Sequence, residues 1–134
     1  MSFFLEKCRH NWTRRYNALQ KYQDKLILPK PAENSEPSCG FLISVRPESG
    51  LNRDQITQYI EAHTIQTRLL FAGNIIRQPC FIQAGESDKY RVTGSLERTD
   101  FIMNHTFWVG VYPGMMDKMI DHRAKIIMGV VNEV

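Results

Sequence analysis

Hydrophobic residues recur every three or four positions in the first part of the chain, which places them on one face of an α-helix. Ser2 is a suitable N-cap for this helix, and Pro29 and Pro31 cannot continue it. The stripe consists of Phe4, Cys8, Trp12, Tyr16, Leu19, Tyr22 and Leu26. The pattern predicts one leading helix over residues 1–28, with an apolar face that needs a partner surface.

The pattern changes after a connector rich in proline, serine and asparagine. Residues 41–45, FLISV, form a short apolar run that is typical of a buried strand. Asn52 can cap a short amphipathic helix with Ile56 and Ile60 on one face. Residues 65–71, IQTRLLF, follow closely and indicate a second strand. This order of elements favours a layer of strands covered by helices.

The last third of the chain continues the alternation. Ser95 is a candidate N-cap for a helix over residues 96–103, and residues 106–112 form an apolar strand that ends before Pro113. We expect Trp108, in the middle of this strand, to pack in the core. A final helix follows, with one side formed by Met116, Met119, Ile120, Arg123, Ile127 and Val130.

These elements predict an α/β (α+β) fold: a small three- to four-stranded sheet covered by helices. A chain of 134 residues suits one small domain, here a leading helix over residues 1–28 and an α/β core over residues 39–134. No apolar run approaches the roughly 18 residues that a membrane span needs. The start of the chain also lacks the apolar region of a secretory signal. We therefore expect a cytoplasmic protein with no membrane partner.

Cys8, Cys39 and Cys80 form an odd, widely spaced set. This spacing argues against a disulfide framework, a zinc site or an iron–sulfur site, so we expect reduced, partly buried thiols and no metal. The net charge is +3. Basic residues gather in the leading helix, where a solvated face is the usual explanation, so we expect no nucleic-acid partner. Binding of nucleic acid is a weaker alternative that predicts a steep salt dependence.

Two segments carry the most specific signal. They are TRLLFAGNIIRQP at residues 67–79 and YRVTGSLERTDFIMNHTFWVGVYPG at residues 90–114. Together they resemble the C-terminal small domain of the pyridoxal-phosphate-type sugar aminotransferases and dehydrases of fold type I. The branch that they resemble most is CDP-4-keto-6-deoxyglucose 3-dehydrase of lipopolysaccharide biosynthesis. The resemblance runs from about residue 41 to the last helix.

The resemblance implies C3 deoxygenation of a CDP-4-keto-6-deoxyhexose, for 3,6-dideoxyhexose and O-antigen synthesis. In this family a large domain binds the cofactor, pyridoxal or pyridoxamine phosphate (PLP or PMP), and carries the catalytic groups. We therefore expect no catalytic residue and no iron–sulfur ligands in this chain, and a large cofactor domain or a homodimer as partner. The role implied for the chain is to clamp the nucleotide-sugar and close the active site.

The resemblance also places residues 68–81 at the mouth of the active site. Gly73 allows a close backbone approach, Asn74 can donate and accept, and Arg77 can pair with a phosphate. The expected substrate-binding residues are Arg68, Phe71, Gly73, Asn74, Arg77, Gln78, Arg91 and His105. Each has a structural alternative, because exposed arginines commonly pair with carboxylates and a histidine such as His105 commonly bonds a backbone carbonyl.

A second interpretation is a non-catalytic oligomerisation or partner-binding module derived from a sugar aminotransferase. Trp12, Tyr16 and Tyr22 would be buried against the large domain in a complete enzyme, and without that domain they would leave an exposed apolar patch of the kind that marks an interface.

Overall fold

The computed structural model describes residues 2–37, 40–84 and 90–133, without the side chains of Ser2, Ala84 and Glu133. The predictions for the Ser2 cap and the Cys39 thiol therefore lie outside the described part. The α-helices are α1 (Ser2–Leu19), α2 (Arg53–Ala62), α3 (Pro79–Ala84), α4 (Glu97–His105) and α5 (Asp117–Glu133). The strands are β1 (Leu26–Ile27), β2 (Phe41–Val45), β3 (Thr67–Leu69) and β4 (Thr106–Val109). Short 3-10 helices are η1 (Gln20–Tyr22), η2 (Pro47–Ser49) and η3 (Ile75–Arg77).

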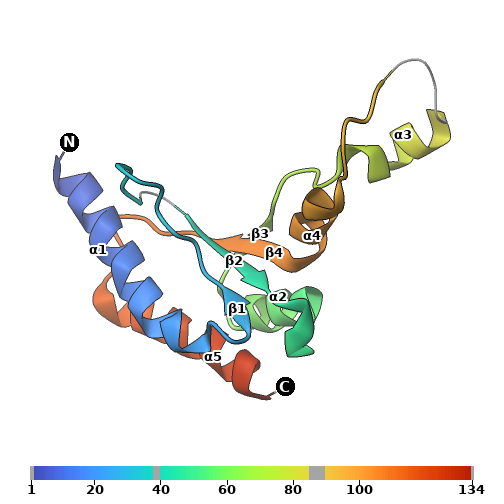
Figure 1. Cartoon of the computed structure of the whole chain (residues 1–134). Helices are drawn as coiled ribbons and strands as arrows, with labels where there is room; N and C mark the ends of the chain where they lie inside the picture. Colours follow the sequence, from blue (N-terminus) through green and yellow to red (C-terminus); the bar gives the residue numbers. More distant parts are fainter. Residues whose placement is uncertain (1, 38–39, 85–89, 134) are drawn as a thin grey trace.

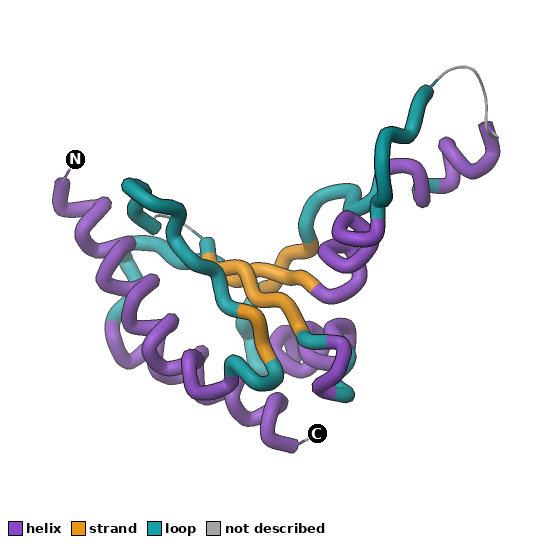
Figure 2. Tube along the Cα trace, viewed as in Figure 1, coloured by secondary structure: helices purple, strands orange, loops and turns teal. Residues whose placement is uncertain are grey.

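The four strands form one antiparallel sheet in the order β1-β2-β4-β3. Side chains alternate between its two faces, so Phe41 and Ile43 of β2 and Phe107 and Val109 of β4 are buried on the same side. Helices α1, α2 and α5 contribute to the core against this side. Figures 1 and 2 show α1 and α5 running side by side, with α3 and α4 extending away at the opposite end. The expected fold, a three- to four-stranded sheet covered by helices, is confirmed, and the sheet has four strands.

The leading helix ends earlier than the sequence pattern predicts. α1 stops at Leu19, the η1 turn follows, and Leu26 pairs with Val45 as part of β1. Leu26 is buried in the same core as the α1 residues, so its hydrophobicity suits the helical stripe and the strand equally well. The prediction of a helix to residue 28 was wrong because pairing with β2 decides the conformation here. Phe4, at the start of the stripe, is 64% exposed.

Trp108 does not lie in the core. It pairs with Leu42 on one side and Arg68 on the other, and it is only partly buried. Its neighbours Phe107 and Val109 occupy the core face, and strand alternation therefore turns Trp108 to the opposite face. The expectation that Trp108 packs in the core was wrong for this reason.

None of the helices that the structure describes has the length and hydrophobicity to cross a membrane.

Candidate functional site

The loop after β3 has an unusual backbone at two positions. Phe71 has a φ of 44° and its side chain is 94% exposed, while Gly73 has a φ of 62°. A Cβ at position 73 would lie 2.9 Å from both Cβ and Sδ of Met103, and closer still to Cγ. Glycine is therefore required here because the loop packs tightly against α4. The close approach expected at Gly73 is made, within this chain, to Met103.

The side chain of Asn74 is buried and forms hydrogen bonds within the chain. It is only 2% exposed, and its Oδ1 accepts the Ile76 N–H at 3.3 Å, which caps η3. Its Nδ2 donates to Oδ1 of Asp100 at 2.7 Å, which joins the loop to α4. The expected donor and acceptor capacity of Asn74 is therefore used at least in part inside the chain.

Arg77 pairs with the same carboxylate. Its Nη2 lies 3.0 Å from Oδ2 of Asp100. The hydrogen bond from Arg77 lowers the pKa of Asp100 most, and the hydrogen bond from Asn74 lowers it further. The neighbouring Gln78 donates from Nε2 to the carbonyl of Ala72 at 2.6 Å. The sequence analysis gave pairing with a carboxylate as the alternative to ligand binding for Arg77, and this ion pair is such a contact. The Arg77 side chain is nevertheless 60% exposed, so its ligand role stays a prediction.

A hollow of about 320 Å³ lies beside this loop and is called the loop hollow below. Gly73 and Asn74 line it together with Arg91, so the fold brings these three candidates to one place. Most of the remaining lining is apolar and includes Phe81 and Tyr90, whose rings meet edge to face with centroids 5.4 Å apart. Such a lining, with few polar groups, is typical of a small-molecule site.

Two other candidates lie elsewhere. His105 ends α4, where its Nδ1 lies 3.1 Å from the carbonyl oxygen of Phe101 and its ring stacks on the Phe101 ring. A contact with a backbone carbonyl is what the sequence analysis gave as the alternative to substrate binding for His105. Arg68 lies on β3 and lines a different hollow from Arg91.

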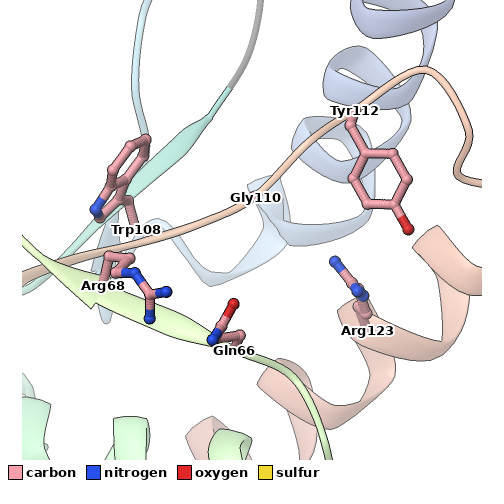
Figure 3. A pocket seen from close by; sticks show the side chains of 6 residues that line it. All are labelled: Gln66, Arg68, Trp108, Gly110, Tyr112 and Arg123. Atoms are coloured by element: carbon pink, nitrogen blue, oxygen red, sulfur yellow. The ribbon is translucent and has the colours of Figure 1, made fainter.

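The hollow beside Arg68 has a volume of about 230 Å³ and is called the arginine hollow below. Its lining residues are Gln66, Arg68, Trp108, Gly110, Tyr112 and Arg123. Figure 3 shows the side chains of Arg68 and Gln66 on one side of a space and those of Arg123 and Tyr112 on the other. The sequence analysis did not select Gln66, Tyr112 or Arg123 as site residues. The sequence signal that could have found them was a cation, Arg123, within the apolar side of the last helix.

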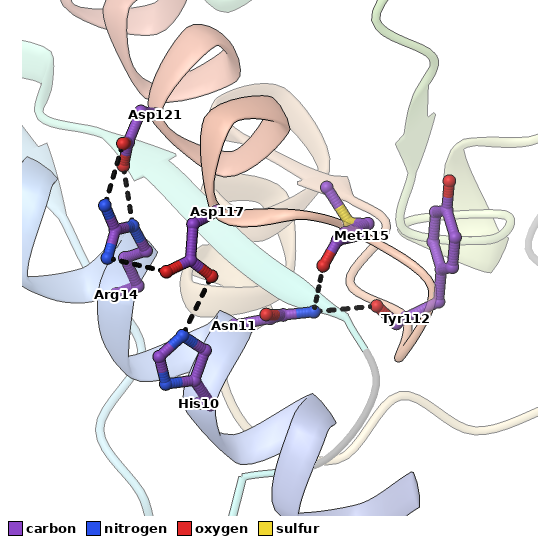
Figure 4. A network of polar contacts seen from close by, with 7 residues as sticks. All are labelled: His10, Asn11, Arg14, Tyr112, Met115, Asp117 and Asp121. Atoms are coloured by element: carbon purple, nitrogen blue, oxygen red, sulfur yellow. Dashed lines mark hydrogen bonds and ion pairs between the residues drawn. The ribbon is translucent and has the colours of Figure 1, made fainter.

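A polar network fixes α5, and thereby Arg123, against α1. Arg14 binds Asp121 through two hydrogen bonds of 2.7 and 2.8 Å, and its Nη1 lies 3.1 Å from Asp117. His10 Nε2 lies 3.0 Å from the other oxygen of Asp117 (Figure 4). The hydrogen bond from Arg14 lowers the pKa of Asp121, and the hydrogen bond with His10, aided by the charge of Arg14, lowers the pKa of Asp117.

Asn11 holds the turn that carries Tyr112. Its Nδ2 donates to the carbonyl of Tyr112 at 2.9 Å and to that of Met115 at 3.3 Å (Figure 4). Asn11 is fully buried, so the turn between β4 and α5 has a fixed position on α1. The three arginines of α1 are also engaged within the chain: Arg9 pairs with Glu36, Arg14 with Asp117 and Asp121, and Arg15 is buried.

The aromatic face of α1 is covered by the chain itself. Trp12 is buried, stacks on Tyr16 with ring centroids 5.4 Å apart, and packs on Phe41 of the sheet. Tyr22 also packs against the core. The exposed aromatic surface expected for a binding module was therefore wrong at these positions, because the sheet and α5 supply the partner surface.

The described hollows do not suit PLP by themselves. A PLP site combines an amine or its substitute with an acid for the pyridine nitrogen. Neither the loop hollow nor the arginine hollow is lined by a lysine or a carboxylate. A hollow beside β1 contains Lys30 without an acid, and one beside Glu61 contains no lysine. Among the residues that the structure describes, no cluster of acidic, histidine and cysteine side chains could hold a metal ion.

Residues 1–128 match the model of the DegT/DnrJ/EryC1/StrS aminotransferase family. The lipopolysaccharide biosynthesis protein RfbH of Salmonella typhimurium is 43% identical over 120 residues, which are 89% of this chain and 26% of that protein. The dTDP-4-dehydro-2,6-dideoxy-D-glucose 3-dehydratase of Saccharopolyspora spinosa is 40% identical over 128 residues, which are 95% of this chain and 27% of that protein. The chain thus spans about a quarter of the length of these two curated relatives.

Solved structures share the fold. The E. coli GDP-4-keto-6-deoxy-D-mannose-3-dehydratase with bound hydrated PLP has a TM-score of 0.77 and 18% identity, over 94% of this chain and 31% of that one. The aminotransferase from Psychrobacter cryohalolentis has a TM-score of 0.78 and 16% identity, over 98% of this chain and 35% of that one.

Proposed function

Because the chain belongs to the DegT/DnrJ/EryC1/StrS aminotransferase family, we propose that it is the C-terminal region of a PLP- or PMP-dependent nucleotide-sugar 3-dehydratase. The observation that carries this proposal is the 40% identity over 128 residues to a protein named as a sugar 3-dehydratase. The solved 3-dehydratase and aminotransferase share only 18% and 16% identity and support the fold alone. The preference for dehydration at C3 over amination therefore comes from the named 3-dehydratase relative.

In this proposal the substrate is a CDP-linked 4-keto-6-deoxyhexose, and the product leads to 3,6-dideoxyhexoses and O-antigen. The similarity to a lipopolysaccharide biosynthesis protein supports the pathway. One curated relative is named for a dTDP-linked sugar and one solved structure for a GDP-linked sugar, so the titration below compares all three nucleotides.

The proposed task of the described residues is to bind and orient the sugar nucleotide and to exclude water. The apolar loop hollow with Arg91 at its wall, and the exposed Arg77 next to it, suit orientation and closure. The cofactor, when bound, supplies an electron sink for loss of the C3 hydroxyl. Its binding is assigned to the part of the longer relatives that this chain does not span, and the proposed partner of the chain is that large cofactor domain or a second copy in a homodimer. We also propose that this reaction takes place in the cytoplasm.

Calorimetric titration with CDP-, GDP- and dTDP-linked hexoses and with pyridoxamine phosphate tests the ligand class. We expect saturable binding that is tightest for the CDP-sugar and weakened by Arg77→Ala. Arg98→Ala is the control, because Arg98 is an exposed cation on α4. Equal affinity for all three nucleotides would contradict the CDP assignment, and an equal effect of the two substitutions would contradict a specific role of Arg77.

A chimera tests the reaction. The segment of the Salmonella RfbH protein that matches this chain is replaced by this chain, and loss of the C3 hydroxyl is measured with a CDP-4-keto-6-deoxyhexose. We expect dehydration without net amination of the sugar. An aminated product would contradict the 3-dehydratase assignment.

A further inference from the structure

The arginine hollow contains cations that lack an acidic partner. Arg68 and Arg123 both line it, and neither forms an ion pair with a carboxylate in the described residues. Arg68 donates from Nη1 to the adjacent Thr67 carbonyl at 3.1 Å, and Arg123 Nη1 lies 3.8 Å from the sulfur of Met115. Glu61 lines a neighbouring hollow with Arg68, but its carboxylate accepts the Thr67 hydroxyl.

A third cation lies behind the wall of this hollow. Arg15 is 0% exposed, and its Nη1 donates to the carbonyl of Gly110, a lining residue, at 3.1 Å. Its Nε and Nη2 are buried and have no hydrogen-bond partner within the described residues. Burial and the charge of Arg123 together lower the pKa of Arg15 to about 10. Burial of a charge without a compensating anion is unfavourable, so the site has a positive potential that an anion would neutralise.

We propose that the arginine hollow binds a phosphate-bearing anion, which Arg68 and Arg123 contact directly while the charge of Arg15 acts from behind Gly110. Three cations match a group with two or more negative charges better than they match a single carboxylate. The Gln66 amide and the Tyr112 hydroxyl lie around the same space and can add neutral donors (Figure 3).

The size of the hollow limits what part of a ligand it holds. Its volume of about 230 Å³ is below the roughly 300–1,000 Å³ of sites that enclose a whole small-molecule ligand. It therefore fits one end of a larger molecule. This inference rests on the proposed function where the anion is the diphosphate of the sugar nucleotide. A free phosphate or pyrophosphate carries the same charged group and could bind to the same arginines. The phosphate would then be contacted by Arg68 and Arg123, which have no carboxylate partner among the described residues. Arg77, in contrast, is paired with Asp100.

The test titrates the full chain with inorganic pyrophosphate, CDP and a CDP-hexose, and follows the Arg Nε–Hε signals by NMR. We expect saturable binding that shifts the Arg68 and Arg123 signals. Arg123→Gln and Arg68→Gln should each weaken binding about tenfold or more, the loss typical of a charge-assisted hydrogen bond, and Arg123→Lys should weaken it less. Lys118→Gln removes the same charge from an exposed position on the same helix and should change affinity less than about twofold.

Equal losses in Arg123→Gln and Lys118→Gln, or no binding of any phosphate-bearing probe, would overturn the inference. Arg123→Gln changes a partly buried side chain at the hollow, so its fold is checked by circular dichroism, and Arg68→Gln, on an exposed strand residue, provides an independent variant.

The outcomes also separate this inference from the proposed function. Binding of a CDP-hexose that Arg123→Gln and Arg68→Gln leave unchanged would overturn the hollow as the phosphate site and leave the proposed function standing. Binding of pyrophosphate that is equally tight to that of the CDP-hexose would support the phosphate site and count against this chain as a sugar-nucleotide clamp.

Discussion

The backbone of Gly73 lies directly against the side chain of Met103. The left-handed φ of 62° at residue 73 and the absence of a Cβ both allow this contact. The sulfur of Met103 also accepts the N–H of Asn74 at 3.3 Å. The loop after β3 and helix α4 therefore form one packed unit, and a change in either will reach the loop hollow.

Gly73→Ala should destabilise the protein by about 1–3 kcal/mol, because it adds both backbone strain and an overlap with Met103. Gly50→Ala is the matched control, since Gly50 has a φ of 74° but the space that a Cβ would occupy there has no neighbouring atom within 4 Å. It should carry the strain alone and cost about 1 kcal/mol. Urea denaturation measures both, and equal losses would contradict a role for the Met103 contact.

Asn74→Ala should cost about 1–2 kcal/mol, because it removes the cap of η3 and the hydrogen bond to Asp100. Amide hydrogen exchange at Ile76, whose N–H bonds Asn74, should accelerate at the same time. Asn104→Ala, at an exposed position of α4, is the control and should leave both quantities nearly unchanged. Unaltered exchange at Ile76 in Asn74→Ala would refute the capping role.

Asp121→Asn should have an effect that depends on pH. The pKa of Asp121 is lower in the folded chain than its usual value of 3.8, so the stabilisation from Arg14 is fully present above that value. It disappears as the pH falls through 3.8 and then through the lower folded pKa. The difference in melting temperature between wild type and variant should therefore be larger at pH 7 than near pH 3. Asp24→Asn is the control, because Asp24 is exposed and forms no ion pair with the other described residues, and an equal pH dependence of the two variants would contradict the role of the Arg14 pair.

Arg15→Met should raise the stability of the free chain by up to about 2 kcal/mol, because it replaces a buried, incompletely bonded cation by an apolar side chain of similar length. Saturating pyrophosphate should narrow or reverse this difference, since binding stabilises the wild type more. Thermal melts with and without pyrophosphate measure both effects. A variant that is less stable than wild type in both conditions would show that Arg15 has a purely structural role.

Local sequence patterns were sufficient for the elements with a strong internal signal. The apolar run at residues 41–45 forms strand β2 as predicted, and the Oδ1 of Asn52 accepts the N–H of Asp54 at 2.8 Å as expected of a cap. β1 was missed because a strand of two residues exists only through its pairing with β2. Arg15, inside a basic run, has the pattern of a surface residue, and only the assembled fold shows that it is buried.

The candidate site was predictable in the same partial way. The composition of the loop after β3 drew attention to Gly73 and Asn74, and both have special environments. Their partners Met103 and Asp100 lie on α4, more than twenty residues further along the chain. The arginine hollow likewise joins residues from three separate segments. Such contacts depend on tertiary packing, which periodicity and local motifs do not encode.

The pairing of α1 with α5 has a consequence for how the protein forms during synthesis. Arg14 and Asp121 are 107 positions apart, so α5, which packs along α1, leaves the ribosome long after α1 does. Until then only part of the surface that covers α1 is present, such as Phe41 against Trp12, and the rest of its apolar stripe is open to chaperones or to other nascent chains. Contacts of such long range also slow folding. A chain that ends before α5 should therefore be prone to aggregation. The last helix completes the cover of the apolar stripe of α1.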